Sequence, residues 1–191
     1  MSLQKINTRS LVLIAMILVC SFGRLISYSY PYTLSNFTPL GAIALFGGAY
    51  FSDKWKAFAI VLLTLYLSDI FIDYLYTSKL MLWYGGAEWV YLPFMLMVVI
   101  GIFIKKISVL NVFVGTIAGV CIHWLISDLP WFYGIRYTHD LTGYFHSLVA
   151  AIPFERNMLA ADVIFGAILF GGFEFAKSKY TILRSKRELA V

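Results

Sequence analysis

Charged side chains lie inside stretches of this sequence that are otherwise apolar enough to be buried in a membrane. A charge at membrane depth costs about 2.5–3.5 kcal/mol on insertion scales, so each such residue requires a partner or a function. The residues concerned come from four different apolar stretches. They are Arg24, Asp69, Asp73, Asp128 and Asp162, with the titratable His123 close to Asp128. We expect these side chains to lie at one level, in the outer third of the membrane.

Asp69 and Asp73 are four residues apart, which places them on one face of a helix. Two neighbouring carboxylates in a low dielectric cannot both ionise cheaply, so either one is protonated or a cation such as Arg24 lies between them. Two interpretations remain open. Arg24 pairs with one aspartate only to hold two helices together, or the group forms the polar floor of a pocket that binds a solute or a coupling ion.

His123 belongs to a stripe that advances by four residues, from Gly115 through Gly119 to Ser127. This spacing keeps the four residues on one helix face and predicts that the histidine points into a bundle of helices. Cys121 lies on another face, so the two residues do not form a metal-binding pair, and we expect no metal site. With Cys20 in another apolar stretch as the only other cysteine, no disulfide framework is expected.

Composition assigns the chain to the membrane proteins. Of its 191 residues, 61% are hydrophobic and only 13% are charged, whereas soluble domains carry about 25% charged residues. Soluble enzymes and nucleic-acid-binding domains are therefore excluded. We expect an all-α bundle of six transmembrane helices in a single domain, 1–191. The predicted spans are approximately 10–28, 38–52, 56–76, 89–104, 108–129 and 157–176.

Basic residues predict the orientation of this bundle. If the amino terminus is cytoplasmic, eleven of the fifteen Lys and Arg residues fall in inner segments. The outer side then keeps only Arg24, Lys79, Arg136 and Arg156. The positive-inside rule therefore predicts that both termini are cytoplasmic. The expected location is the bacterial cytoplasmic (inner) membrane, with the lipid bilayer as surroundings.

The outer segments 29–37, 77–88 and 130–156 are long and aromatic, whereas the inner connections are short. A binding site or lid is therefore expected on the outer face. Trp131, Tyr133 and Tyr137 would supply stacking surfaces there. Residues 140–151 are predicted to form a short interfacial helix that ends before the last span, although a lid would need the same residue mixture.

Two local predictions concern helix ends. Thr38 is expected to cap the second span, with Pro39 in its first turn. Glu174, near the inner end of the last span, is expected to pair with Lys177 rather than to form a site. No nucleophile, metalloprotease, nucleotide-binding or dinucleotide-binding motif occurs, so neither an enzyme nor a cofactor is expected.

Three segments resemble an uncharacterised family of small six-span bacterial transport proteins: SNFTPLGAIALFGGAYF (35–51), LSDIFID (67–73) and AAIPFERNMLAADVIFGAILFGGFEF (150–175). The chain departs from the family pattern at Glu155, where an aromatic residue usually follows Pro-Phe. More distantly, TPLGAIALFGGAYFSDKWKAF resembles the layout of the substrate-binding S components of energy-coupling-factor vitamin transporters, and of small cobalamin transporters. This resemblance implies an outward-facing pocket and, as a partner, a transmembrane coupling subunit with ATPases.

The favoured hypothesis is therefore uptake of a small vitamin-like or aromatic solute through an outward-facing pocket. The expected substrate-binding residues are Arg24, Asp69, Asp73, His123, Asp128, Asp162, Trp131, Tyr133 and Tyr137. One alternative is a structural or assembly subunit whose buried charges hold the helices in register. Another is a membrane enzyme acting on lipid or prenyl substrates. The sequence contains no aspartate motif with the spacing that such an enzyme requires.

Overall fold

The computed structural model describes residues 7–129, 136–185 and 188–189, and the regular elements among them are helices only. The predicted all-α class is thus confirmed for the described residues, and several of the helices are long and apolar. The elements are α1 (Thr8–Ser21), α2 (Arg24–Ser29), α3 (Leu40–Tyr50), α4 (Lys54–Thr77), α5 (Ala87–Phe103), α6 (Val109–Ser127), α7 (Leu141–Gly166), the π-helical turn η1 (Ala167–Gly171), α8 (Gly172–Lys179) and the 3₁₀ turn η2 (Thr181–Leu183).

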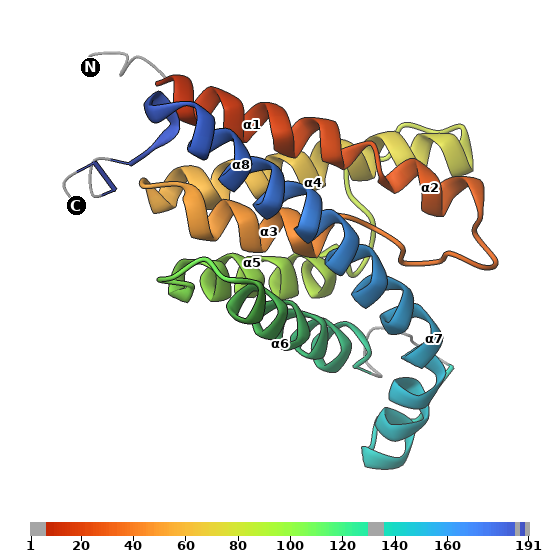
Figure 1. The fold of residues 1–191 in the computed structure, drawn as a ribbon. Coiled ribbons are helices and arrows are strands. Elements are labelled where there is room, and N and C mark those ends of the chain that lie inside the picture. The colour runs from red at the N-terminus through yellow and green to blue at the C-terminus, as the bar shows by residue number, and fades with distance from the viewer. Residues whose placement is uncertain (1–6, 130–135, 186–187, 190–191) are drawn as a thin grey trace.

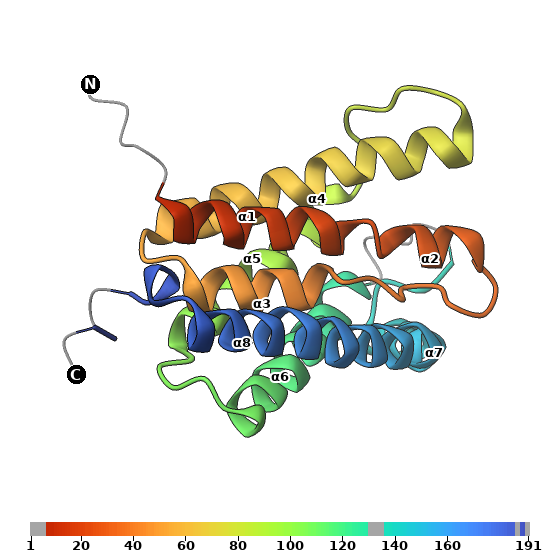
Figure 2. The same ribbon diagram turned by 45° about the horizontal axis from the view of Figure 1, so that its top comes forward.

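The helices run back and forth along one common direction (Figure 1). The start of α1 and the end of α8 lie at the same end of the bundle in both views (Figures 1 and 2). We call this the terminal end. The long connections 30–39 and 78–86, together with residues 128–129 and 136–140, lie at the opposite end, which we call the loop end. The short connections 51–53 and 104–108 return the chain at the terminal end.

Helix α3 forms the centre of the molecule. Ten of its eleven residues are buried, and it contacts α1, α4, α5, α6 and α7. Its glycines allow the closest approach, because a Cβ on Gly48 would lie 2.1 Å from the carbonyl oxygen of Val98 in α5. A Cβ on Gly101 in α5 would likewise lie 2.3 Å from the carbonyl oxygen of Leu45. Small residues in both helices therefore let the two backbones touch.

Four helical segments of the described residues are long and apolar enough to cross a membrane: Thr8–Ser29, Lys54–Thr77, Val109–Ser127 and Leu141–Lys179. The other two predicted spans correspond to shorter helices. At about 1.5 Å per residue, the 11-residue α3 covers roughly half of a 30 Å hydrocarbon layer. Because α3 is buried among its neighbours, this short helix lies against protein rather than lipid.

The separate interfacial helix predicted for residues 140–151 is wrong. Residues 141–166 form one helix, and Pro153 lies inside it. Asp140 caps this helix by accepting a 2.8 Å hydrogen bond from the Gly143 N–H, and this bond lowers the pKa of Asp140. A proline within a helix can bend the helix without ending it. In Figure 1 the amino-terminal part of α7 bends away from the other helices of the bundle.

An ionic cluster fastens the carboxyl-terminal segment at the terminal end. Lys177 contacts Glu174 at 2.8 Å, which confirms the pairing predicted for these two residues, and it also contacts Glu188 at 2.5 Å. Arg9 of α1 donates to the carbonyl oxygens of Leu183, at 2.6 Å, and Tyr50, at 3.0 Å. Helices α1, α3 and α8 are therefore joined where their ends meet.

Candidate functional site

Arg24 and Asp69 form an ion pair between α2 and α4. One guanidinium nitrogen lies 2.6 Å from Asp69 Oδ1 and 2.6 Å from the Ser68 hydroxyl oxygen. The second carboxylate oxygen, Oδ2, accepts a 2.9 Å hydrogen bond from the Tyr91 hydroxyl of α5. The side chains of Arg24 and Asp69 are 17% and 9% exposed. This closed set of contacts satisfies the charges and joins three helices.

Asp73 lies one turn beyond Asp69, under the 78–86 connection. Both aspartates border a space of only about 10 Å³, which Trp83 and Tyr84 help to enclose. A space of that size holds about one water molecule. Burial, followed by the charge of nearby Asp69, raises the pKa of Tyr84, so this phenol stays protonated beside the carboxylates. The connection covers the aspartates and leaves no room for an organic solute.

A larger cavity opens at the loop end between α6, α7 and the connection that joins them. Its volume is about 350 Å³. Polar side chains from each of these elements line it: Ser127 and Asp128 at the end of α6, Arg136 and Tyr137 in the connection, and Ser147 in α7. Asn36 closes one wall in a left-handed conformation, with φ 60°, which asparagine tolerates better than most residues. We call this space the outer cavity.

The floor of the outer cavity holds a buried pair, His123 of α6 and Glu155 of α7. His123 Nδ1 lies 2.9 Å from Glu155 Oε1, and their side chains are 9% and 7% exposed. Ser127 donates to the backbone carbonyl of His123 at 2.7 Å. Glu155 Oε2 is buried and has no hydrogen-bond partner among the described residues. Glu155 also lines the outer cavity, so this oxygen is a candidate acceptor for a donor group on a bound molecule.

Asp162 lies deeper in the bundle, where it caps α3. Its Oδ1 accepts a 2.8 Å hydrogen bond from the backbone N–H of Ala42, and the residue is 1% exposed. The prediction that Thr38 caps this helix is wrong, because its hydroxyl makes no hydrogen bond in the described structure. A carboxylate from a neighbouring helix replaces that local cap. Gly41 is required beside it, since a Cβ there would lie 2.1 Å from Asp162 Oδ2.

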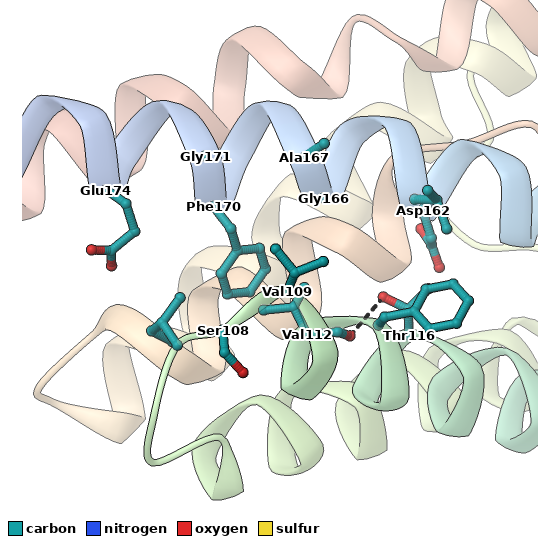
Figure 3. Close-up of a pocket in the computed structure, with 13 residues that line it drawn as sticks. Ser108, Val109, Val112, Thr116, Asp162, Gly166, Ala167, Phe170, Gly171 and Glu174 are labelled. Carbon is teal, nitrogen blue, oxygen red and sulfur yellow. Dashed lines mark hydrogen bonds between the residues drawn. The ribbon is translucent and has the colours of Figure 1, made fainter.

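Asp162 also lies at one end of a groove between α6 and the segment from α7 to α8, with Glu174 at the other end (Figure 3). The groove has a volume of about 450 Å³. Between the two carboxylates its lining is mainly apolar, from residues such as Val109, Val112 and Phe170. In a bilayer, lipid chains can fill an apolar groove, whereas the polar outer cavity requires polar contents. The outer cavity is therefore the better candidate for a specific site.

The residues predicted to form one site fall into three places. Arg24, Asp69 and Asp73 are together beneath the 78–86 connection, His123, Asp128 and Tyr137 line the outer cavity, and Asp162 caps α3. Trp131 and Tyr133 lie outside the described residues. The predicted inward direction of His123 is confirmed, because the whole stripe from Gly115 to Ser127 is buried.

Sequence reasoning missed Glu155 as the partner of His123. A signal was present, since Glu155 precedes Asp162 by seven residues and therefore shares its helix face across two turns. The predictions of a helix over 140–151 and of a last span over 157–176 left Glu155 between two helices and hid this relation. Tyr91, the partner of Asp69, left no comparable signal, because a tyrosine in an apolar helix is common. Within the described part of the chain, no group of three or more His, Cys, Asp or Glu residues can hold a metal ion.

Comparison with known proteins places the chain in one family. No curated protein and no solved structure matches it. A family model described as "Family of unknown function (DUF6580)" matches residues 4–185, which is nearly the whole chain. The protein belongs to this family of unknown function, DUF6580.

Proposed function

We propose that this protein is a membrane component for the uptake of a small polar solute, which it binds in the outer cavity. The observation that carries the proposal is the buried Glu155 Oε2, which has no partner among the described residues and belongs to a residue that lines the cavity. Burying a carboxylate oxygen without a donor is costly, so a bound molecule that supplies a donor to Oε2 would stabilise the protein. The volume of about 350 Å³ is at the lower end of the range for small-molecule sites.

The distribution of basic residues supports an orientation for this uptake. Lys54, Lys56, Lys105 and Lys106 adjoin the connections at the terminal end, and Lys177 and Lys179 lie in the last turn of α8. The positive-inside rule assigns that end to the cytoplasm and the loop end to the outside. In this arrangement six helical segments cross or enter the membrane, both termini are cytoplasmic, and the outer cavity opens outward.

The Arg24–Asp69 pair favours the structural-subunit alternative for that part of the molecule. Its charges are closed on each other and on Ser68 and Tyr91, so they hold helices together without a ligand. We therefore assign Arg24, Asp69 and Asp73 to stability and His123, Asp128 and Tyr137 to the solute. The aromatic side chains of Tyr137 and Phe154 suit a solute with an apolar or aromatic body.

The chain has no recognisable nucleotide-binding motif, so uphill transport would require an ion gradient or a coupling subunit with ATPases. Such a partner is part of the proposal. It would contact the terminal end or the lipid-facing helices, because the loop end carries the solute cavity.

The test is a thermal-unfolding screen of the purified full-length protein against vitamins, nucleobases, amino acids and amines. A ligand at 100 times its dissociation constant adds about 2.7 kcal/mol to the free energy of unfolding. We expect a selective stabiliser whose effect is lost in Ala150→Trp, because Ala150 lines the cavity and is exposed, so the larger side chain fills the space without displacing the core.

The matched control is Val149→Trp, which changes the neighbouring exposed position outside the cavity lining and should leave the stabilisation intact. The proposal is contradicted if no solute stabilises the wild type. It is also contradicted if the stabiliser acts equally on Ala150→Trp.

A further inference from the structure

The chemistry of the outer cavity points to a class of solute. We infer that the bound molecule carries a protonated amine, which donates to Glu155 Oε2. This inference rests on the proposed function, because it assumes that the outer cavity is a solute site. The inference specifies the charge and the hydrogen-bond donor of the solute, which the volume of the cavity does not determine.

The first observation is the hydrogen-bonding state of Glu155. Its Oε1 lies 2.9 Å from His123 Nδ1, whereas its Oε2 has no partner among the described residues. A carboxylate accepts hydrogen bonds only, so a ligand must offer a donor at Oε2. An ammonium group supplies both the donor and the opposite charge, and such charge-assisted hydrogen bonds are about twice as strong as neutral ones.

The second observation is the charge of the cavity lining. Two carboxylic residues, Asp128 and Glu155, and one arginine, Arg136, are among the described residues that line it, beside His123. Acidic side chains outnumber arginine in the described lining, which favours a cationic solute over an anionic one. A carboxylate solute would instead add a second negative charge beside Glu155, in a space where water is limited.

The third observation is the aromatic lining. Phe154 precedes Glu155 in α7, and Tyr137 lies in the connection before that helix; both line the cavity. Aromatic faces attract ammonium groups by about 0.5–2 kcal/mol, depending on desolvation. A protonated amine in the cavity would interact with both the carboxylates and the aromatic rings. Ca²⁺ and Mg²⁺ suit the site less well, since they take six or more ligands, mainly oxygen atoms.

The experiment compares probes of equal size and different charge. Benzylammonium, benzyl alcohol and benzoate share one aromatic body, and butylammonium removes the ring while keeping the amine. Thermal unfolding of the purified full-length protein is followed for each probe in the millimolar range, at constant ionic strength set with sodium chloride. We expect saturable stabilisation by the two amines, with benzylammonium binding at least tenfold more tightly than benzyl alcohol.

Two substitutions locate the effect. Glu155→Gln keeps the size of the side chain and its acceptor oxygen but removes the charge, and it should weaken benzylammonium binding at least tenfold. Glu88→Gln is the matched control, because Glu88 is an exposed carboxylate at the start of α5 that does not line the cavity. Binding should be unchanged there. If Glu155→Gln does not fold, loss of amine binding in Ala150→Trp but not in Val149→Trp assigns the effect to the cavity.

The inference is overturned if no amine stabilises the protein, if benzyl alcohol or benzoate does so equally well, or if amine binding survives in Glu155→Gln. A neutral or anionic solute from the wider screen that loses its effect in Ala150→Trp would leave the proposed function standing and refute only the amine. If no solute of any charge acts through the cavity, both proposals fail.

Discussion

Arg24 is the residue on which the ion pair between α2 and α4 depends. Arg24→Leu would leave Asp69 as a buried carboxylate without its cation, in contact with hydroxyl groups such as that of Tyr91. Removing one partner of a buried pair costs about 3–5 kcal/mol, so the thermal midpoint of the purified protein should fall steeply. Replacing both residues, as in Arg24→Leu with Asp69→Leu, removes the unpaired charge and should recover most of the loss. A single variant as stable as the wild type would show that the pair has no structural role.

Gly41 provides a second test at the scale of single residues. In Gly41→Ala, the new Cβ would lie 2.1 Å from Asp162 Oδ2, and the carboxylate would have to leave its position beside the Ala42 N–H. We expect a loss of about 1–3 kcal/mol in the free energy of unfolding. Gly166→Ala is the control, because nothing lies within 4 Å of a Cβ built there, and alanine favours the helix. Equal effects of the two substitutions in thermal unfolding would refute the proposed contact.

The direction of a side chain could be predicted from the sequence where it depends on the spacing of residues within one helix. The interior direction of His123 followed from spacing by four, and the pairing of Arg24 with an aspartate was one of two interpretations left open. The cap on α3 could not be read in this way, because Asp162 is 120 residues away from its partner. Contacts between distant helices depend on how the bundle packs, which one sequence does not specify.

The crossing of α3 and α5 should be the least tolerant feature among the elements. A Cβ on Gly48 would meet the Val98 carbonyl oxygen at 2.1 Å, and backbone atoms cannot rotate away as a side chain can. Gly48→Ala should therefore force the helices apart and destabilise the protein by about 1–3 kcal/mol or more. Gly171→Ala, where a Cβ meets open space, should be tolerated. Both effects are measurable by chemical or thermal unfolding, and a harmless Gly48→Ala would contradict the close approach.

The carboxyl-terminal segment should be released by acid. Partial burial favours the protonated form of Glu188, but hydrogen bonds from Lys177 and from Ser185 outweigh it and lower its pKa to about 2. Because the folded pKa lies below the usual 4.5, this contribution is fully present above about pH 4.5 and is lost as the pH falls towards 2. Proteolysis of the segment should accelerate across that window. In Glu188→Gln the segment should already be cleaved faster at neutral pH, and unchanged rates would contradict the anchor.

At the scale of elements, hydropathy located the first five predicted spans to within a few residues, but it placed the start of the last one at 157, whereas α7 begins at Leu141. It failed where tertiary packing determines the outcome. The helix α3 is shorter than a membrane is thick because its surroundings are protein, and α7 continues through Pro153 because a proline bends a helix without always ending it. Composition reports how apolar a segment is, but it does not report whether lipid or protein surrounds it.

The orientation of the whole molecule can be tested with cysteine labelling. Lys79 lies in a loop-end connection and Lys105 in a terminal-end connection. In a background with Cys20 and Cys121 replaced by alanine, a membrane-impermeant maleimide added to intact cells should label Lys79→Cys and not Lys105→Cys. Labelling of both variants after cell lysis is the control for reactivity. The reverse pattern would place the outer cavity on the cytoplasmic side and exclude uptake from outside.

The central claim is that the outer cavity admits a solute for uptake, and accumulation in cells tests it most directly. Cells expressing the wild type, Ala150→Trp or Val149→Trp at equal levels are incubated in one complex medium, and their small-molecule contents are compared by mass spectrometry. We predict that at least one solute, an amine in the present account, accumulates with the wild type and Val149→Trp but not with Ala150→Trp. Equal accumulation of every solute in all three strains would contradict the claim and favour a structural role.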